Sequence, residues 1–154
     1  MRRIGIVLVV LAASLALTST ATAAGGRTLV TQLTGPVEVP PGDPDGTGTA
    51  SITVNPGLSQ VCWEIAVQNI TLPAAAAHIH NAPAGQNGGV KVDTGLKADS
   101  AIALTSGGTT IDKSSITVDA ALAQDIVDNP ANYYVNVHST VHSGGVVRGQ
   151  LVKK

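Results

Sequence analysis

Apolar and polar residues alternate along much of this chain, and a period of two is the pattern of β-strands that bury one face. The clearest alternation covers residues 50–54 and ends at the turn sequence of residues 55–57. Residues 60–70 alternate in the same way and place Val61, Trp63, Ile65 and Val67 on one face. The two stretches predict a β-hairpin in which Trp63 is a core residue.

Other segments rich in β-branched residues lie between clusters of Gly, Pro, Asn and Asp, which favour turns. One segment has helical spacing instead, because Asp119 can cap a helix that runs to Val127 and ends before Asn129-Pro130. Closely spaced strands with one short helix predict an all-β fold, an antiparallel β-sandwich or barrel. The predicted strands besides the hairpin are 27–39, 77–80, 90–93, 101–104, 115–118, 133–139 and 146–152.

The first residues have the composition of a cleavable export signal. Two arginines precede an apolar run over residues 4–17, and small residues follow as far as Ala24. The run is shorter than the roughly 20 apolar residues that span a bilayer. A signal peptide over residues 1–24 is therefore predicted rather than a membrane anchor. The mature part, residues 27–154, is expected to be one secreted domain, either extracellular or periplasmic, with no membrane span.

Charge and cysteine content exclude several classes of function. The formal net charge is −1 and the mature part has no cluster of Lys and Arg, so nucleic acids are not expected as partners. Cys62 is the only cysteine, so no disulfide can form within the chain. Its apolar neighbours predict a buried, inert thiol. Because the common hydrolase, phosphate-binding and dinucleotide-binding motifs are missing as well, an enzyme is not expected.

All four histidines fall in two places, at residues 78–80 and 138–142. Residues two apart in a strand point to the same face, so His78 and His80 project together. If their strand lies beside the strand of His138, three imidazole nitrogens could bind zinc or copper and leave a fourth position open. By the same parity Asn136 shares a face with His138, and Arg148 shares one with Gln150.

A structural role for these histidines is the alternative. Polar residues commonly occupy the solvent side of strands, and a histidine can simply bond a neighbouring backbone group. His142 lies beside a glycine turn and is expected to be exposed rather than a ligand. Glu38, at the end of the first predicted strand, could face either solvent or the histidines. Solvent is the usual environment of such a carboxylate and is the expectation for Glu38.

The segments Leu33–Pro41, Ala77–His80, Tyr134–His138 and Arg148–Gln150 occur in this order along the chain. Together they resemble the CHRD domain, a module first described in chordin, and the resemblance extends from about Gln32 to Leu151. The resemblance implies an extracellular, immunoglobulin-like β architecture and no general biochemical activity. The chain departs from the family pattern at His142-Ser143, where Asn-Pro is common. It also departs at Val146, where an acidic residue is usual, so an ion pair of Arg148 cannot be assumed. Position by position, the pattern selects Glu38, His78, His80, Asn136, His138, Arg148 and Gln150.

Three functions are compatible with these observations. The first, which the sequence favours, is a secreted binding or structural module whose polar cluster is a hydrogen-bond network or a metal site. The second is a metalloenzyme similar to copper/zinc superoxide dismutase, although that chemistry uses more ligands than these histidines readily provide. The third, a partner in extracellular signalling, depends on the chordin analogy alone, and function resides in sites rather than folds. None of the three identifies the extracellular partner.

Overall fold

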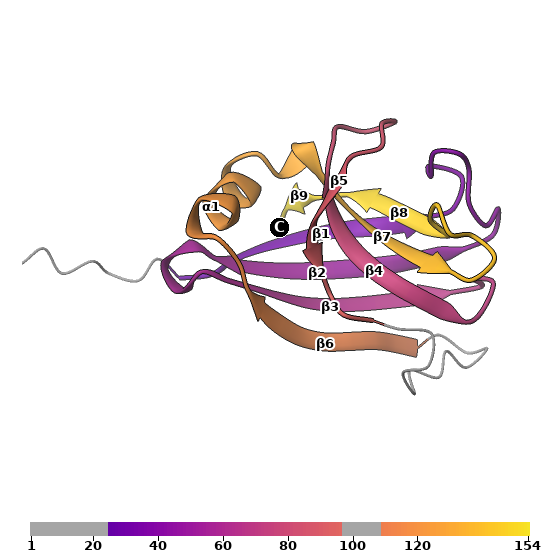
Figure 1. The fold of residues 1–154 in the computed structure, drawn as a ribbon, viewed down its shortest axis with the longest axis horizontal. Coiled ribbons are helices and arrows are strands. Elements are labelled where there is room, and N and C mark those ends of the chain that lie inside the picture. The colour runs from indigo at the N-terminus through magenta and orange to yellow at the C-terminus, as the bar shows by residue number, and fades with distance from the viewer. Residues whose placement is uncertain (1–24, 97–108) are drawn as a thin grey trace, which may run out of the picture.

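The computed structural model describes residues 25–96 and 109–154, with the backbone alone for residues 109–113. Figure 1 shows a molecule made mainly of β-strands with one α-helix at one end. The strands are β1 (Arg27–Thr34), β2 (Thr47–Asn55), β3 (Gln60–Gln68), β4 (Ala74–Asn81), β5 (Gly89–Asp93), β6 (Thr109–Thr117), β7 (Tyr133–Ser139), β8 (Val147–Gln150) and β9 (Val152–Lys153). The helices are α1 (Ala120–Asp128) and the 3-10 turns η1 (Pro56–Leu58) and η2 (Pro130–Asn132).

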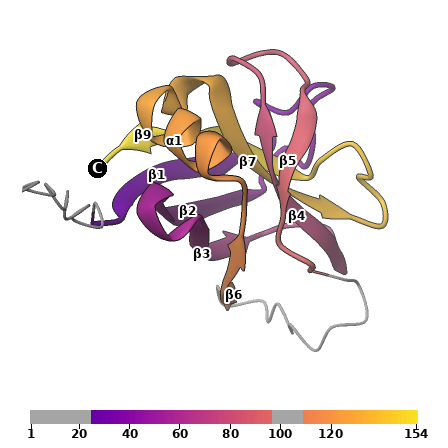
Figure 2. The ribbon, with the colours of Figure 1, turned by 60° about the vertical axis from the view of Figure 1, so that its left-hand side comes forward.

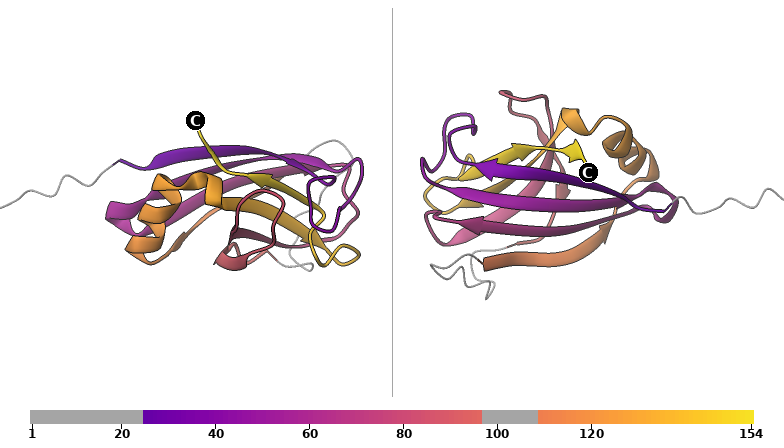
Figure 3. Two further views of the ribbon diagram at one scale, coloured as in Figure 1. Left: turned by 90° about the horizontal axis from the view of Figure 1, so that it is seen from above. Right: turned by 180° about the vertical axis from the view of Figure 1, so that it is seen from behind.

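All described strands belong to one antiparallel sheet. Their order is β5-β4-β7-β8-β1-β2-β3-β6, and β9 pairs with β1 beside β8. The sheet curls into a half-barrel, so that its two halves face each other, as the view from above shows (Figure 3, left). The predicted antiparallel all-β fold with one helix is confirmed.

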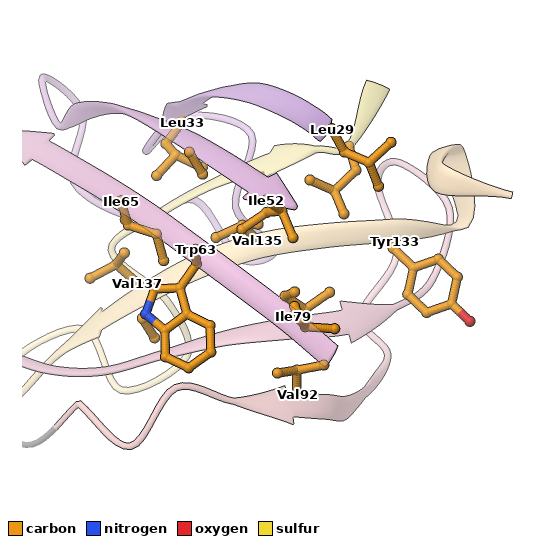
Figure 4. Packing of buried hydrophobic residues seen from close by; sticks show 14 of the residues in the cluster. Leu29, Leu33, Ile52, Trp63, Ile65, Ile79, Val92, Tyr133, Val135 and Val137 are labelled. Carbon is orange, nitrogen blue, oxygen red and sulfur yellow. The ribbon is translucent and has the colours of Figure 1, made fainter. Parts of the chain in front are cut away.

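The core fills the inside of this curl. Strands β2 and β3 pair in the predicted hairpin register, and Trp63 is 3% exposed. Figure 4 shows Trp63 directed toward residues of the opposite half of the sheet. The alternation in the hairpin sequence arises because β2 and β3 bury every second side chain here. Buried members from the facing strands are Ile52, Val61, Ile65, Ile79, Val92, Val135 and Val137.

Helix α1 closes one end of the core, beside η1 and the ends of β2 and β3 (Figure 2). The carboxylate of Asp119 accepts hydrogen bonds from the backbone N–H groups of Ala121 and Leu122, which confirms the predicted cap. Ala123 and Ile126 form its buried side. Within the part of the chain described, no helix is long and apolar enough to cross a membrane.

Several local predictions differ from the structure. The first strand ends at Thr34 rather than at residue 39, because the N–H groups of Glu38 and Gly42 both bond to the carbonyl of Gly35 and turn the chain. The last strand is interrupted at Leu151, whose N–H still donates to the carbonyl of Tyr133 on β7, whereas the next residue begins β9, which pairs with β1. Cys62 is half-buried rather than buried, since its neighbours Val61 and Trp63 occupy the inner face.

The predicted signal peptide, residues 1–24, and the predicted strand at 101–104 lie outside the described residues. The boundary of the mature domain remains a prediction for the same reason.

Candidate metal centre

Three neighbouring strands carry polar side chains on the face of the sheet that looks away from the core. Strand β7 pairs with β4 on one side and with β8 on the other, and His78, Asn136 and Arg148 lie opposite one another across them. His80 and His138 each lie two residues further along their strands, so their side chains share this face. The structure thus brings together the polar residues that the two-residue period of the strands predicted to share a face.

Loops cover much of this outer face, so several of its polar groups are buried even though they point away from the apolar core. Arg148 is 3% exposed and Asn136 is 1% exposed. The segment that joins β4 to β5 lies over them, because the carbonyl of Gln86 accepts a hydrogen bond from Arg148 at 2.9 Å. The segment after β1 is tied to the same cover, since the amide of Asn87 donates to the carbonyl of Val39 at 2.7 Å.

His78, His80 and His138 form a compact triad. Nδ1 of His78 lies 3.0 Å from Nε2 of His138, and one ligand nitrogen of each histidine lies within 4.8 Å of the others. A tetrahedral zinc ion with bonds of 2.0–2.1 Å holds its nitrogen ligands about 3.4 Å apart. The pair of His78 and His138 comes within about half an ångström of that spacing. The ligand nitrogen of His80 lies no more than 4.8 Å from the other two.

Backbone carbonyls hold two members of the triad in the tautomer that leaves Nε2 free to bind a metal ion. Nδ1 of His80 lies 2.9 Å from the carbonyl oxygen of Gly88, and Nδ1 of His138 lies 2.9 Å from that of Ser143. A carbonyl only accepts, so both Nδ1 atoms carry the proton and both Nε2 atoms keep a lone pair. Metal-ligating histidines are commonly oriented through their second nitrogen in this way.

The third member, His78, is arranged differently. Its Nδ1 is the donor to Nε2 of His138, and its Nε2 lies 3.8 Å from Oδ1 of Asp93 on β5. A metal ion placed between the rings would replace the bond between His78 and His138. The proton of His78 would then sit on Nε2, on the side of the Asp93 carboxylate, which favours that tautomer.

Burial lowers the pKa of both His78 and His138 below the usual 6.5. At His78 the charges of His138 and His80 lower the pKa further, and the Asp93 carboxylate opposes them. At His138 the hydrogen bond to Ser143 opposes the effect of burial. Both imidazoles therefore stay neutral, the form that binds metals, at a lower pH than free histidine does.

The metal-free protein is expected to lose stability as the pH falls below about 6.5. Below that pH the unfolded chain protonates His78 and His138 more readily than the folded protein does, so acid favours unfolding until the pH passes the folded-state pKa values. Urea denaturation at pH about 7.5 and about 5.5 measures the loss. Asp43 and Asp125, whose pKa values are lowered from 3.8, titrate in more acid solution.

The variant His78→Gln/His138→Gln is the control, because it removes both titrating groups. Its stability should change less between the two pH values than that of the natural chain. An equal pH dependence in both proteins would contradict the assignment.

Glu38 is buried beside the triad, and the expectation that it faces solvent is wrong. Its Oε2 accepts a hydrogen bond from Nε of Arg148 at 2.7 Å, and the two side chains are 0% and 4% exposed. The chain turns at Gly35, and this turn carries Glu38 back over the sheet. Arg148 thus has a carboxylate partner, although the acidic residue usual near position 146 in the family pattern is missing.

Tyr134 also belongs to this face, a residue that the sequence analysis did not select. Its ring stacks on His80 with centroids 4.9 Å apart and planes 3° from parallel. Cζ of Arg148 lies 4.1 Å from the same ring centroid, and cation–π attraction favours that position. Tyr134 lies two residues before Asn136 in β7, so strand parity could have identified it.

The Arg148-Gly149-Gln150 segment has a structural explanation at each position. Gln150 donates through Nε2 to the carbonyls of Ala82 and Ala131 at 2.8 and 2.6 Å, so it fixes the scaffold rather than joining the triad. A Cβ at Gly149 would lie 2.1 Å from the carbonyl oxygen of Gln32. Only glycine therefore allows β1 to approach β8 at this point.

His142 does not join the group of potential metal ligands in the described residues, as expected. It is half-buried, so the expectation that it is exposed is wrong. Its segment is held close to β7, since the backbone N–H of His142 donates to the hydroxyl of Ser139. The carbonyls of Gly88 and Ser143 were missed, because any residue supplies a carbonyl and the side-chain pattern carries no information about it.

A family model, that of the CHRD domain, matches residues 29–151, nearly the whole chain. This range includes every residue of the triad and of the Glu38–Arg148 pair. No curated protein and no solved structure matches the chain.

Proposed function

The chain belongs to the CHRD domain family, and we propose that it is a secreted, non-enzymatic binding module. This module holds one zinc or copper ion through His78, His80 and His138. The export pattern of residues 1–24 supports secretion.

One observation carries the metal proposal. Nε2 of His80 is buried and has no hydrogen-bond partner in the part of the chain described, while Nδ1 of the same ring donates to Gly88. Buried polar atoms are nearly always paired, because desolvating one without a partner is unfavourable. A lone pair held in place beside two further imidazoles is what a metal ion would satisfy.

The donor set narrows the choice of ion. Three neutral imidazole nitrogens suit zinc and copper, whereas magnesium and calcium prefer oxygen ligands. His142 lies outside the triad, so the described residues offer no fourth histidine ligand. Superoxide dismutation needs a redox metal and more histidines, which is why a binding module is the better-supported proposal.

Titration of the purified, metal-free protein with Zn²⁺ and Cu²⁺ tests the proposal, with metal content measured by elemental analysis. The natural chain should bind one equivalent at micromolar concentration. His80→Ala/His138→Ala should bind at least about a hundredfold more weakly, since two of three ligands are lost. His142→Ala is the matched control and should bind as the natural chain does.

Two outcomes would contradict the proposal. One is the absence of stoichiometric binding, and the other is an equal loss of affinity in the His142→Ala control. A superoxide assay on the copper-loaded protein separates the two functions, because activity above that of free copper would favour the enzyme.

A further inference from the structure

We infer that Asn136 and Glu38 hold a water molecule at the fourth coordination position of the metal, through Oδ1 and Oε1 respectively. This inference rests on the proposed metal site and assigns to both residues a positioning role that the triad alone does not explain.

Three buried side-chain atoms lack a hydrogen-bond partner in the part of the chain described: Glu38 Oε1, His80 Nε2 and Asn136 Oδ1. All three are acceptors, since the other ring nitrogen of His80 carries its proton. Three unpaired acceptors on one covered face indicate missing donors or a missing cation. A metal ion bound by Nε2 of His80 would satisfy that atom. Oε1 of Glu38 and Oδ1 of Asn136 would still lack a hydrogen-bond donor.

Asn136 occupies the centre of the site. It lies opposite His78 on one side and Arg148 on the other, and it precedes His138 by two residues on the same face. Its side chain therefore stands between the triad and the ion pair of Arg148 with Glu38. At 1% exposure it cannot take its hydrogen bonds from bulk solvent.

Glu38 reaches the site from the covering loop. Arg148 binds only one of its carboxylate oxygens, Oε2. The other, Oε1, lies against Gly145, in the same turn whose residue Ser143 holds the ring of His138. The carboxylate is thus packed against the turn that holds the ring of His138.

A metal-bound water matches what these residues lack. It has two O–H groups, and two acceptors remain once the metal has bound His80. Three histidines leave a fourth position open on a tetrahedral ion, where water is the usual ligand. Coordination makes this water a stronger donor, and water bridges of this kind pair buried polar groups effectively.

Azide binding to the Co²⁺-loaded protein tests the inference, because azide replaces coordinated water and changes the visible spectrum of Co²⁺. In the natural chain Asn136 Oδ1 and the Glu38 carboxylate favour water and disfavour the anion. Asn136→Leu has a similar volume and no acceptor. It should still bind one Co²⁺, with affinity for Co²⁺ lowered about tenfold and affinity for azide raised about tenfold.

Asn136→Asp is the second variant, in case the apolar one does not fold. It keeps the shape and adds a negative charge, so azide should bind about tenfold more weakly than to the natural chain. Gln150→Leu is the control, since Gln150 lies on the same face but bonds only backbone carbonyls. Its azide affinity should be unchanged.

The outcomes separate the two proposals. If the natural chain binds no Co²⁺, Zn²⁺ or Cu²⁺, the metal site and this inference both fail. If it binds Co²⁺ but azide leaves the spectrum unchanged, or if azide affinity is the same in both Asn136 variants and the natural chain, the metal site stands and the held water is wrong.

Discussion

Arg148→Met is expected to destabilise the protein by about 4 kcal/mol, because it leaves a buried carboxylate without its counter-ion. The side chain of Glu38 is 0% exposed and its hydrogen bond to Arg148 is 2.7 Å long. Arg148 also donates to Gln86 and Asn87 on the covering loop, and both bonds are lost in the variant. Urea denaturation of the metal-free protein near neutral pH measures the change in the free energy of unfolding.

The double variant Glu38→Leu/Arg148→Met identifies the cause of that loss. Removing the carboxylate as well should restore at least half of the lost stability, since two apolar groups can replace a buried ion pair at little cost. Arg27→Met is the control at an exposed position on β1 and should change the stability by less than about 0.5 kcal/mol. A double variant no more stable than Arg148→Met would show that the unpaired carboxylate is not the cause.

Gly145→Ala is expected to cost about 3 kcal/mol, from backbone strain and overpacking together. Gly145 has a φ of +138°, a conformation that residues with a side chain rarely adopt. A Cβ at this position would lie 2.2 Å from Oε1 of Glu38, so the ion pair would have to move. Thermal or urea unfolding of the purified variant gives the value.

The neighbouring glycine provides a control for this prediction. A Cβ at Gly144 would meet nothing within 4 Å, and its φ lies outside the left-handed region. Gly144→Ala should therefore leave the stability unchanged or raise it slightly. Similar losses in the two variants would mean that the turn tolerates neither substitution for a reason other than the Glu38 contact.

Strand periodicity predicted those parts of the site that lie on regular strands. His78, His80, Asn136 and His138 obey the period of two, so their common face follows from the sequence once their strands are neighbours. The order of strands in the curled sheet does not follow, because it depends on pairings between segments far apart in the chain. Periodicity therefore groups the three histidines only on the condition that their strands are neighbours, and the pairing of β4 with β7 meets that condition.

Glu38 shows where reasoning from periodicity stops. It follows β1 in an irregular segment, and its burial depends on a turn fixed by backbone hydrogen bonds to Gly35. Such bonds leave little trace in the side-chain pattern. The resemblance included Glu38 in the polar cluster, and the general rule that carboxylates face solvent excluded it. The structure supports the resemblance at this position.

The pairing of the first strand with the last ones has a consequence for when this protein can fold. Strand β1 lies between β2 and the pair β8 and β9, so the middle of the sheet joins the two ends of the domain (Figure 3, right). Glu38 and Arg148 are 110 positions apart in the sequence, so their ion pair can form only after β8 has taken its place in the sheet. Folding dominated by such distant contacts is slow and waits for the whole chain. A chain of this topology cannot complete the middle of its sheet until β8 and β9 have been synthesised.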